Sequence, residues 1–227
     1  EILPSREIEA GDPDPLPEEI VPLPVSYSWD GETRTLDDFL SEASATGLVV
    51  LHDGVRLYEE YRHGADEASR FTSWSVAKSF VATLIAMGLE EGRIESLDDR
   101  VDAYVPEFAG SAYGETTLRQ LLMMSAGLDF NEDYAEGPES DIRPFFFNTF
   151  ILQRDVDAMA AEIVRDRAPG EDLHYVSPNS HVLSAVVRAV YGDTLAAIVE
   201  EKIWTPLQMT SDASWLININ AARGVEL

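Results

Sequence analysis

The chain has 227 residues, 45% of them apolar, which is enough to fill the core of one large domain or of two closely joined lobes. It carries 42 acidic and 16 basic residues, and a formal net charge of −26 disfavours nucleic acid and anionic lipid as partners. The absence of cysteine excludes disulfides and thiolate metal sites, and no run approaches twenty apolar residues, so no membrane span is predicted. Composition leaves the compartment and the oligomeric state open.

The N-terminal residues 1–30 are rich in proline and acidic side chains. Such a composition predicts an arm, either extended over the rest of the protein or disordered, and residues 31–227 are predicted to form the folded domain. A helix is expected to start at Leu36 with Thr35 as its cap. A hairpin follows from Leu48 to Tyr61, with its turn at Asp53-Gly54.

A central helix is predicted from Ser75 to Glu91. Its apolar residues cover most of the helix circumference, as in a helix buried at the centre of a domain; they are Val76, Ala77, Phe80, Val81, Leu84, Ile85 and Met87. Mostly helices and loops are expected from there to Leu207. Patterning alone therefore supports a mixed α and β protein.

Ser75 and Lys78 at the start of this helix form a Ser-x-x-Lys motif. Residues three apart share a helix face, so the Ser75 hydroxyl and the Lys78 amine can meet. Backbone N–H groups and the helix dipole at the first turn stabilise negative charge there, and a lysine in an apolar helix is suited to act as a base. The alternative is an N-cap serine followed by a surface lysine.

A second group of polar residues surrounds Tyr175, after the turn signal Pro169-Gly170. A tyrosine near a serine and a lysine can transfer a proton between a nucleophile and a leaving group. Taken alone, Tyr175 fits an amphipathic core position better than a catalytic one. The four histidines are scattered and lack the spacing of metal ligands, so they are interpreted as structural.

Together these motifs resemble the serine β-lactamase and penicillin-recognising hydrolases, in the class C-like branch that includes carboxylesterases, D-aminopeptidases and aminohexanoate-dimer hydrolases. The resemblance runs from about Leu48 to Leu216 and keeps the order of the family's landmarks. After the hairpin and the Ser-x-x-Lys motif these are Gly92–Asp99, Tyr104–Glu107, Thr117–Leu128, Pro169-Gly170, Tyr175 and Trp204–Met209.

The resemblance implies an α+β fold of the β-lactamase/transpeptidase type, an antiparallel sheet flanked by helices beside an all-α lobe, with the site in the cleft between them. It implies that Ser75 is the acylated nucleophile, that Lys78 keeps it deprotonated, and that Tyr175 is the general base and acid. It also implies that neither a metal nor an organic cofactor takes part. The expected substrate is a small ester, amide or peptide-like molecule.

Two features near the implied site depart from the family pattern. Ser177 stands where the second motif usually has asparagine, and it lacks the carboxamide that would orient a substrate amide; Asn179 is a candidate replacement. The stretch Asp129–Phe150 is predicted to be a loop that brings Tyr134 near the site. Its cluster Phe145–Phe147 either shapes an apolar acyl pocket or packs inward. Ser177 and Tyr134 are therefore the candidate substrate-binding residues.

The family's third motif lies on a strand downstream of the region that matches, and the sequence reaches Leu227 without it. That strand supplies the second N–H of the oxyanion hole, so the sequence predicts a truncated domain that lacks the C-terminal strands. Two functions follow: a serine hydrolase acting through an acyl-enzyme, or a non-catalytic relative that serves as a binding or structural protein. A Ser-His-Asp hydrolase is a weaker alternative because no Gly-x-Ser-x-Gly occurs.

Overall fold

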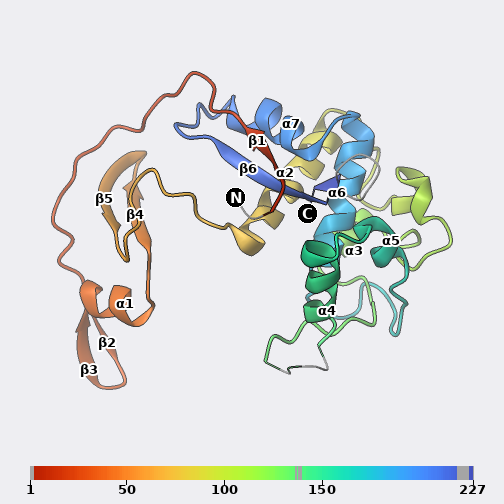
Figure 1. The fold of residues 1–227 in the computed structure, drawn as a ribbon, viewed down its shortest axis with the longest axis horizontal. Helices are drawn as coiled ribbons and strands as arrows, with labels where there is room; N and C mark the ends of the chain where they lie inside the picture. The colour runs from red at the N-terminus through yellow and green to blue at the C-terminus, as the bar shows by residue number, and fades with distance from the viewer. Residues whose placement is uncertain (1–2, 136, 138–139, 219–224, 227) are drawn as a thin grey trace.

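The computed structural model of the chain describes all residues except 1–2, 136, 138–139, 219–224 and 227. Short antiparallel sheets and helices occur in the first third, and helices dominate the remainder (Figure 1). This is the α+β class that the sequence predicts. The proposed division at residue 30 stays a prediction.

The first sixty residues hold short strands and one helix. In chain order they are β1 (Ser5–Ile8), β2 (Ser26–Trp29), β3 (Glu32–Thr35), α1 (Leu36–Glu42), β4 (Gly47–His52) and β5 (Val55–Tyr61). Helix α1 starts where predicted: the Thr35 hydroxyl accepts from the backbone N–H of Asp38, and the Asp38 carboxylate accepts from the backbone N–H of Thr35. This capping box satisfies two backbone donors that the helix leaves free.

Two hairpins in this region close through the same dipeptide. Asp30 and Gly31 join β2 to β3 with φ angles of 51° and 80°, and Asp53 and Gly54 join β4 to β5 with 50° and 78°. Positive φ at both central residues matches the right-handed twist of the strands, and Asp-Gly is well suited to it. The second hairpin confirms the prediction, whereas the first was not predicted.

The remaining elements are mainly helical. They are the short helices η1 (Trp74–Val76), η2 (Val101–Ala103), η3 (Pro106–Phe108), η5 (Phe147–Ile151) and η6 (Glu200–Trp204); the α-helices α2 (Ala77–Glu90), α3 (Leu118–Leu122), α4 (Ile142–Phe146), α5 (Val156–Ala161), α6 (Pro178–Tyr191) and α7 (Leu195–Val199); and the strands β6 (Ala213–Asn218) and β7 (Val225–Glu226).

Strand β1 lies in the predicted arm but pairs with a strand about two hundred residues away. Ser5 to Ile8 face Leu216 to Ala213 in antiparallel register, and β6 pairs with β7 on its other side. Figure 1 shows β1 and β6 side by side against the helices. Ile8 is only 2% exposed, so this part of the arm joins the core.

The main core lies where α2 and α6 pack together. Leu84 and Ile85 of α2 are fully buried, and so are Val186 and Val187 of α6. The prediction of a buried central helix is correct for these positions but wrong for Val76, which is 63% exposed. Ser75 and Val76 form a 3-10 turn before the α-helix, so the predicted start of the helix was too early.

The hairpin β4–β5 stands apart from this core together with α1 and β2–β3, and two chain segments link the parts (Figure 1). None of the residues of β4 or β5 is buried. Among the described residues no single helix is long and apolar enough to cross a membrane, although α6 and the stretch Leu195–Trp204 pass the same criteria as a pair bent by 76°.

Candidate active site

Ser75 lies in the turn η1 that opens into α2, and it is exposed. The residue before it, Trp74, has a φ of 45°, in a region that non-glycine residues seldom occupy. Trp74 is also 71% exposed. Backbone strain of this kind concentrates at functional sites, and here it sits directly beside the candidate nucleophile.

Three predicted side chains converge at Ser75. The Tyr175 hydroxyl donates to Ser75 Oγ over 2.8 Å, and Lys78 Nζ lies 3.3 Å from the same oxygen. Lys78 Nζ also lies 5.4 Å from the centroid of the Tyr175 ring, so it sits over the face of that ring. The structure therefore brings together residues one hundred positions apart, at distances that allow proton transfer among them.

Ser177 lies on the other side of Lys78. It stands at the N-cap position of α6, and its Oγ accepts from Lys78 Nζ over 3.1 Å. The candidate replacement Asn179 lies elsewhere: it is fully buried, and its Oδ1 accepts from the Tyr113 hydroxyl over 2.9 Å. Asn179 thus does not take the place of the missing asparagine, and Ser177 itself occupies that position beside the lysine.

Glu132 is a site residue that sequence reasoning missed. Its carboxylate accepts from both the backbone N–H and the hydroxyl of Ser177, and Tyr134 donates to it over 2.9 Å. Burial and then the hydrogen bond to Glu132 raise the pKa of Tyr134 to about 12, so its hydroxyl keeps its proton at ordinary pH. The only signal in the sequence was an acidic residue two positions before a predicted site tyrosine.

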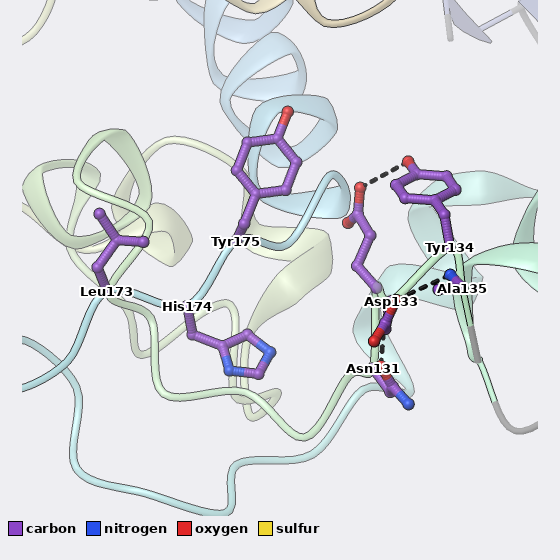
Figure 2. Close-up of a pocket in the computed structure, with 8 residues that line it drawn as sticks. Asn131, Asp133, Tyr134, Ala135, Leu173, His174 and Tyr175 are labelled. Carbon is purple, nitrogen blue, oxygen red and sulfur yellow. Dashed lines mark hydrogen bonds between the residues drawn. The ribbon is translucent and has the colours of Figure 1, made fainter. Parts of the chain in front are cut away.

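An open hollow of about 630 Å³ adjoins these groups. Figure 2 shows Leu173 and Tyr175 on one of its sides and Tyr134 on the other. Tyr134, 54% exposed, and Leu173, 80% exposed, provide apolar surface, while Glu132 and Asp133 provide carboxylates. The hollow therefore presents both apolar and acidic surface beside Tyr175.

The predicted loop Asp129–Phe150 is partly helical, which corrects that prediction. Within it α4 and η5 carry the phenylalanine cluster. Phe145 packs edge-on against Phe130 with centroids 5.7 Å apart, and Phe146 packs against Phe150 at 5.6 Å. These rings build a small second core instead of lining the hollow, so the inward-packing alternative is the correct one for Phe145 and Phe146.

Two of the histidines have well-defined structural contacts near the site. Arg167 donates to Nδ1 of His174, so the ring hydrogen resides on Nε2 and donates to the carbonyl of Phe130 over 2.8 Å. His181 on α6 contacts Asp157 on α5 over 2.7 Å. Both bonds tie chain segments together around the site.

A tight crossing beneath the site depends on Gly127. Its φ is 70°, and a Cβ there would lie 2.4 Å from the carbonyl oxygen of Arg167. The guanidinium of Arg165 closes the same crossing by donating to the carbonyls of Ala126 and Ala112. The segment 163–175 is thus held against the loop after α3. This contact fixes the position of the backbone that carries Tyr175.

The family model described as Beta-lactamase matches residues 33–223, most of the chain. The chain belongs to the beta-lactamase family. The family model spans the hairpin β4–β5, the Ser75 turn, both long helices and Tyr175, so it covers the whole site described above. The resemblance inferred from the motifs is confirmed.

Individual relatives agree with this assignment. The chain is 30% identical over 220 residues to 6-aminohexanoate-dimer hydrolase from Paenarthrobacter ureafaciens, covering 94% of this chain and 55% of that protein. A Bacillus anthracis structure, named provisionally as a 6-aminohexanoate-dimer hydrolase, superposes with a TM-score of 0.85 at 23% identity over 95% of this chain and 59% of that one. A class C beta lactamase from Rhodobacter sphaeroides gives 0.51 at 24% identity over 75% and 46%.

The structural neighbours establish the β-lactamase/transpeptidase-like fold predicted from the sequence. The chain spans a little over half the length of the curated relative that it matches. Activity, substrate and partners of the whole protein therefore belong to the proposal that follows.

Proposed function

We propose that this beta-lactamase family member is a serine hydrolase that cleaves an ester or amide bond through an acyl-enzyme on Ser75. The observation that carries the proposal is the convergence of Lys78 Nζ and the Tyr175 hydroxyl on Ser75 Oγ, at 3.3 and 2.8 Å. A serine is a weak nucleophile until a neighbouring base accepts its proton, and both neighbours are within hydrogen-bond reach.

In the proposed acylation, Ser75 Oγ attacks the carbonyl carbon of the substrate while its proton passes to Lys78. Collapse of the tetrahedral intermediate breaks the bond to the leaving group, which takes a proton from Tyr175. In deacylation a water attacks the acyl carbon and its proton passes to Tyr175, and the bond between the acyl carbon and Ser75 Oγ breaks as Lys78 returns its proton to that oxygen. The N–H of Ser75 itself is one donor for the oxyanion, and each such donor contributes about 3 to 4 kcal/mol.

The proposed substrate is a small amide, ester or peptide-like molecule. The name of the curated relative, 6-aminohexanoate-dimer hydrolase, supports an amide in particular. The hollow beside Tyr175 supports a substrate with an apolar segment, because Tyr134 and Leu173 present exposed apolar surface there. No metal or organic cofactor enters the proposed steps.

The test is the intact mass of the chain after incubation with a fluorophosphonate and, separately, with a penicillin. We expect a mass increase with the fluorophosphonate that disappears in Ser75→Ala, because only an activated serine is phosphonylated at a useful rate. Ser73→Ala is the matched control, since Ser73 is a neighbouring exposed serine whose side chain makes no capping bond. It should label like the parent.

A folded chain that gains no mass under these conditions would overturn the proposal. That outcome would favour the alternative, a family member that binds ligands without turnover. Labelling that persists in Ser75→Ala would place the reactive group elsewhere and would equally contradict the assignment.

A further inference from the structure

The hydroxyl of Ser177 lies between a base and an acid. On one side Lys78 Nζ is 3.1 Å from Ser177 Oγ, and on the other side the carboxylate of Glu132 contacts the same oxygen. A serine hydroxyl has one hydrogen to donate and two lone pairs with which to accept. The neighbour that receives this hydrogen determines whether the hydroxyl accepts a hydrogen bond from Lys78 Nζ or donates one to it.

An ionised carboxylate can only accept hydrogen bonds. Glu132 is surrounded by donors: the backbone N–H and the hydroxyl of Ser177, and the hydroxyl of Tyr134 at 2.9 Å. The neighbouring Asp133 is engaged elsewhere, because its carboxylate accepts from the backbone N–H of Ala135 over 2.8 Å. The proton of the Ser177 hydroxyl is therefore directed to Glu132.

We propose that Glu132 is a positioning residue for Lys78: by taking the proton of the Ser177 hydroxyl, it forces that hydroxyl to accept from Lys78 and leaves the amine lone pair for Ser75. If Ser177 instead donated to Nζ, the lone pair of the neutral amine would be occupied and could not receive the Ser75 proton. The inference rests on the proposed role of Lys78 as the base, and it assigns a function to a residue other than Ser75, Lys78 and Tyr175.

The substitution Glu132→Gln tests the positioning role of Glu132 with almost no change in side-chain volume. The backbone N–H of Ser177 donates to Oε2 of Glu132 and its hydroxyl donates to Oε1, and a carboxamide replaces one of these two oxygens with an NH₂ group that cannot accept. Its NH₂ group faces either the N–H or the hydroxyl of Ser177, and in the second case the serine proton turns toward Lys78. Removing the hydroxyl by Ser177→Ala abolishes this pathway, so Glu132→Gln should have no further effect on Lys78 in that background.

The chain contains only two lysines, Lys78 and Lys202, which makes a direct reading possible. Protein labelled with ¹³C-lysine gives two ε-methylene signals by NMR, and Lys202→Arg assigns them. We expect Glu132→Gln to move the Lys78 signal while the Lys202 signal stays in place, because Lys202 pairs with Glu91 on a different part of the surface. In Ser177→Ala protein the same substitution should leave both signals unmoved.

A kinetic experiment accompanies the NMR reading. Glu132→Gln should lower the maximal rate of Ser75 phosphonylation about 10- to 100-fold, the usual effect of losing a group that orients a reactive one, with little change in the concentration of fluorophosphonate needed for half-maximal rate. The double variant Glu132→Gln/Ser177→Ala should react as fast as Ser177→Ala alone. Glu107→Gln on η3, an exposed glutamate, is the matched control for loss of one charge and should react like the parent.

The outcomes distinguish the proposed role of Glu132 from the proposed serine hydrolase function. An unmoved Lys78 signal in folded Glu132→Gln protein, or an equal movement with and without the Ser177 hydroxyl, would overturn the role of Glu132. A parent chain that is never phosphonylated would overturn the proposed function, while the NMR reading would still decide whether Glu132 positions the lysine.

Discussion

The helical part of the molecule and the hairpin β4–β5 are stabilised in different ways. In the helical part α2 and α6 bury complete apolar side chains, such as Leu84 and Val186, against each other. None of the residues of the hairpin is buried, and Val49 and Leu51 remain 47% and 51% exposed. The hairpin depends on its Asp53-Gly54 turn, its strand pairing and surface ion pairs such as Arg62 with Asp37 at 2.6 Å.

The candidate site lies on the helical part, which is the better stabilised of the two regions. Ser75 lies in the turn η1 directly before α2, Lys78 lies in the first turn of α2, and Ser177 stands at the N-cap position of α6, so the packing of the two helices fixes the distance between these side chains. Exposed ion pairs contribute only about 0 to 1 kcal/mol each, and salt screens them, so the hairpin has no comparable source of rigidity. Three substitutions test this contrast.

The largest effect is expected from Leu84→Ala in α2. Leu84 is fully buried in the core, so its truncation removes apolar contacts and leaves a cavity, at a cost of about 2 to 5 kcal/mol in the free energy of unfolding. Urea denaturation followed by far-UV circular dichroism measures this loss. A cost below about 1 kcal/mol would show that the α2–α6 packing does not dominate stability.

An intermediate effect is expected from Tyr113→Phe, since the fully buried Tyr113 hydroxyl donates to Asn179. Loss of that donor leaves the Asn179 oxygen unsatisfied, which costs about 1 to 3 kcal/mol at neutral pH. Burial also raises the pKa of Tyr113 well above 10.0, its value in the unfolded chain. The stability linked to this proton is therefore fully present below about pH 10 and is lost as the pH rises further.

Tyr113→Phe should consequently reduce the loss of stability above about pH 10, the pKa of tyrosine in the unfolded chain. Thermal unfolding at a series of pH values measures both effects. Tyr27→Phe in β2, where the side chain is not buried, is the control and should change neither. An alkaline loss of equal size in Tyr113→Phe and in the parent would contradict the assignment.

The smallest effect is expected from Leu51→Ala in β4, the same chemical change as Leu84→Ala. Leu51 is half exposed, so we expect the free energy of unfolding to change by no more than about 0.5 kcal/mol, the range of ordinary surface positions. Urea denaturation measures this change as for Leu84→Ala.

Hydrogen exchange compares the two regions directly. Backbone amides of β4 and β5 should exchange faster than those of α2 and α6, because fewer buried contacts oppose their local opening. Equal protection of both regions would remove the contrast.

Local signals in the sequence located several elements correctly. Thr35 caps α1 through hydrogen bonds to a residue three positions away, and Asp53-Gly54 closes its hairpin within two residues. Asp30-Gly31 gives the same signal at the boundary between the predicted arm and the predicted domain, where the sequence analysis places no hairpin. Strand β1 could not be predicted, because it exists through pairing with β6 about two hundred residues away.

The contacts of the candidate site likewise fall into local ones, which the sequence predicts, and distant ones, which it does not. The spacing of Ser75 and Lys78 predicts their contact, because a helical turn brings residues three apart onto one face whatever the rest of the chain does. Family resemblance supplied Tyr175. Glu132 reaches Ser177 across 45 positions from a loop whose course depends on Phe130, Phe145 and Ile142 packing together, and no local pattern encodes that approach.

The sequence by itself determined the family, the contact between Ser75 and Lys78 at the beginning of the central helix, and the turn of the β4–β5 hairpin, since each depends on residues close together in the chain. Only the tertiary structure decided that Tyr175 meets Ser75, that Asn179 faces Tyr113 instead of the site, and that Glu132 holds Ser177. These contacts depend on how separate segments pack, and packing is a property of the whole arrangement of buried side chains, which local spacing does not specify.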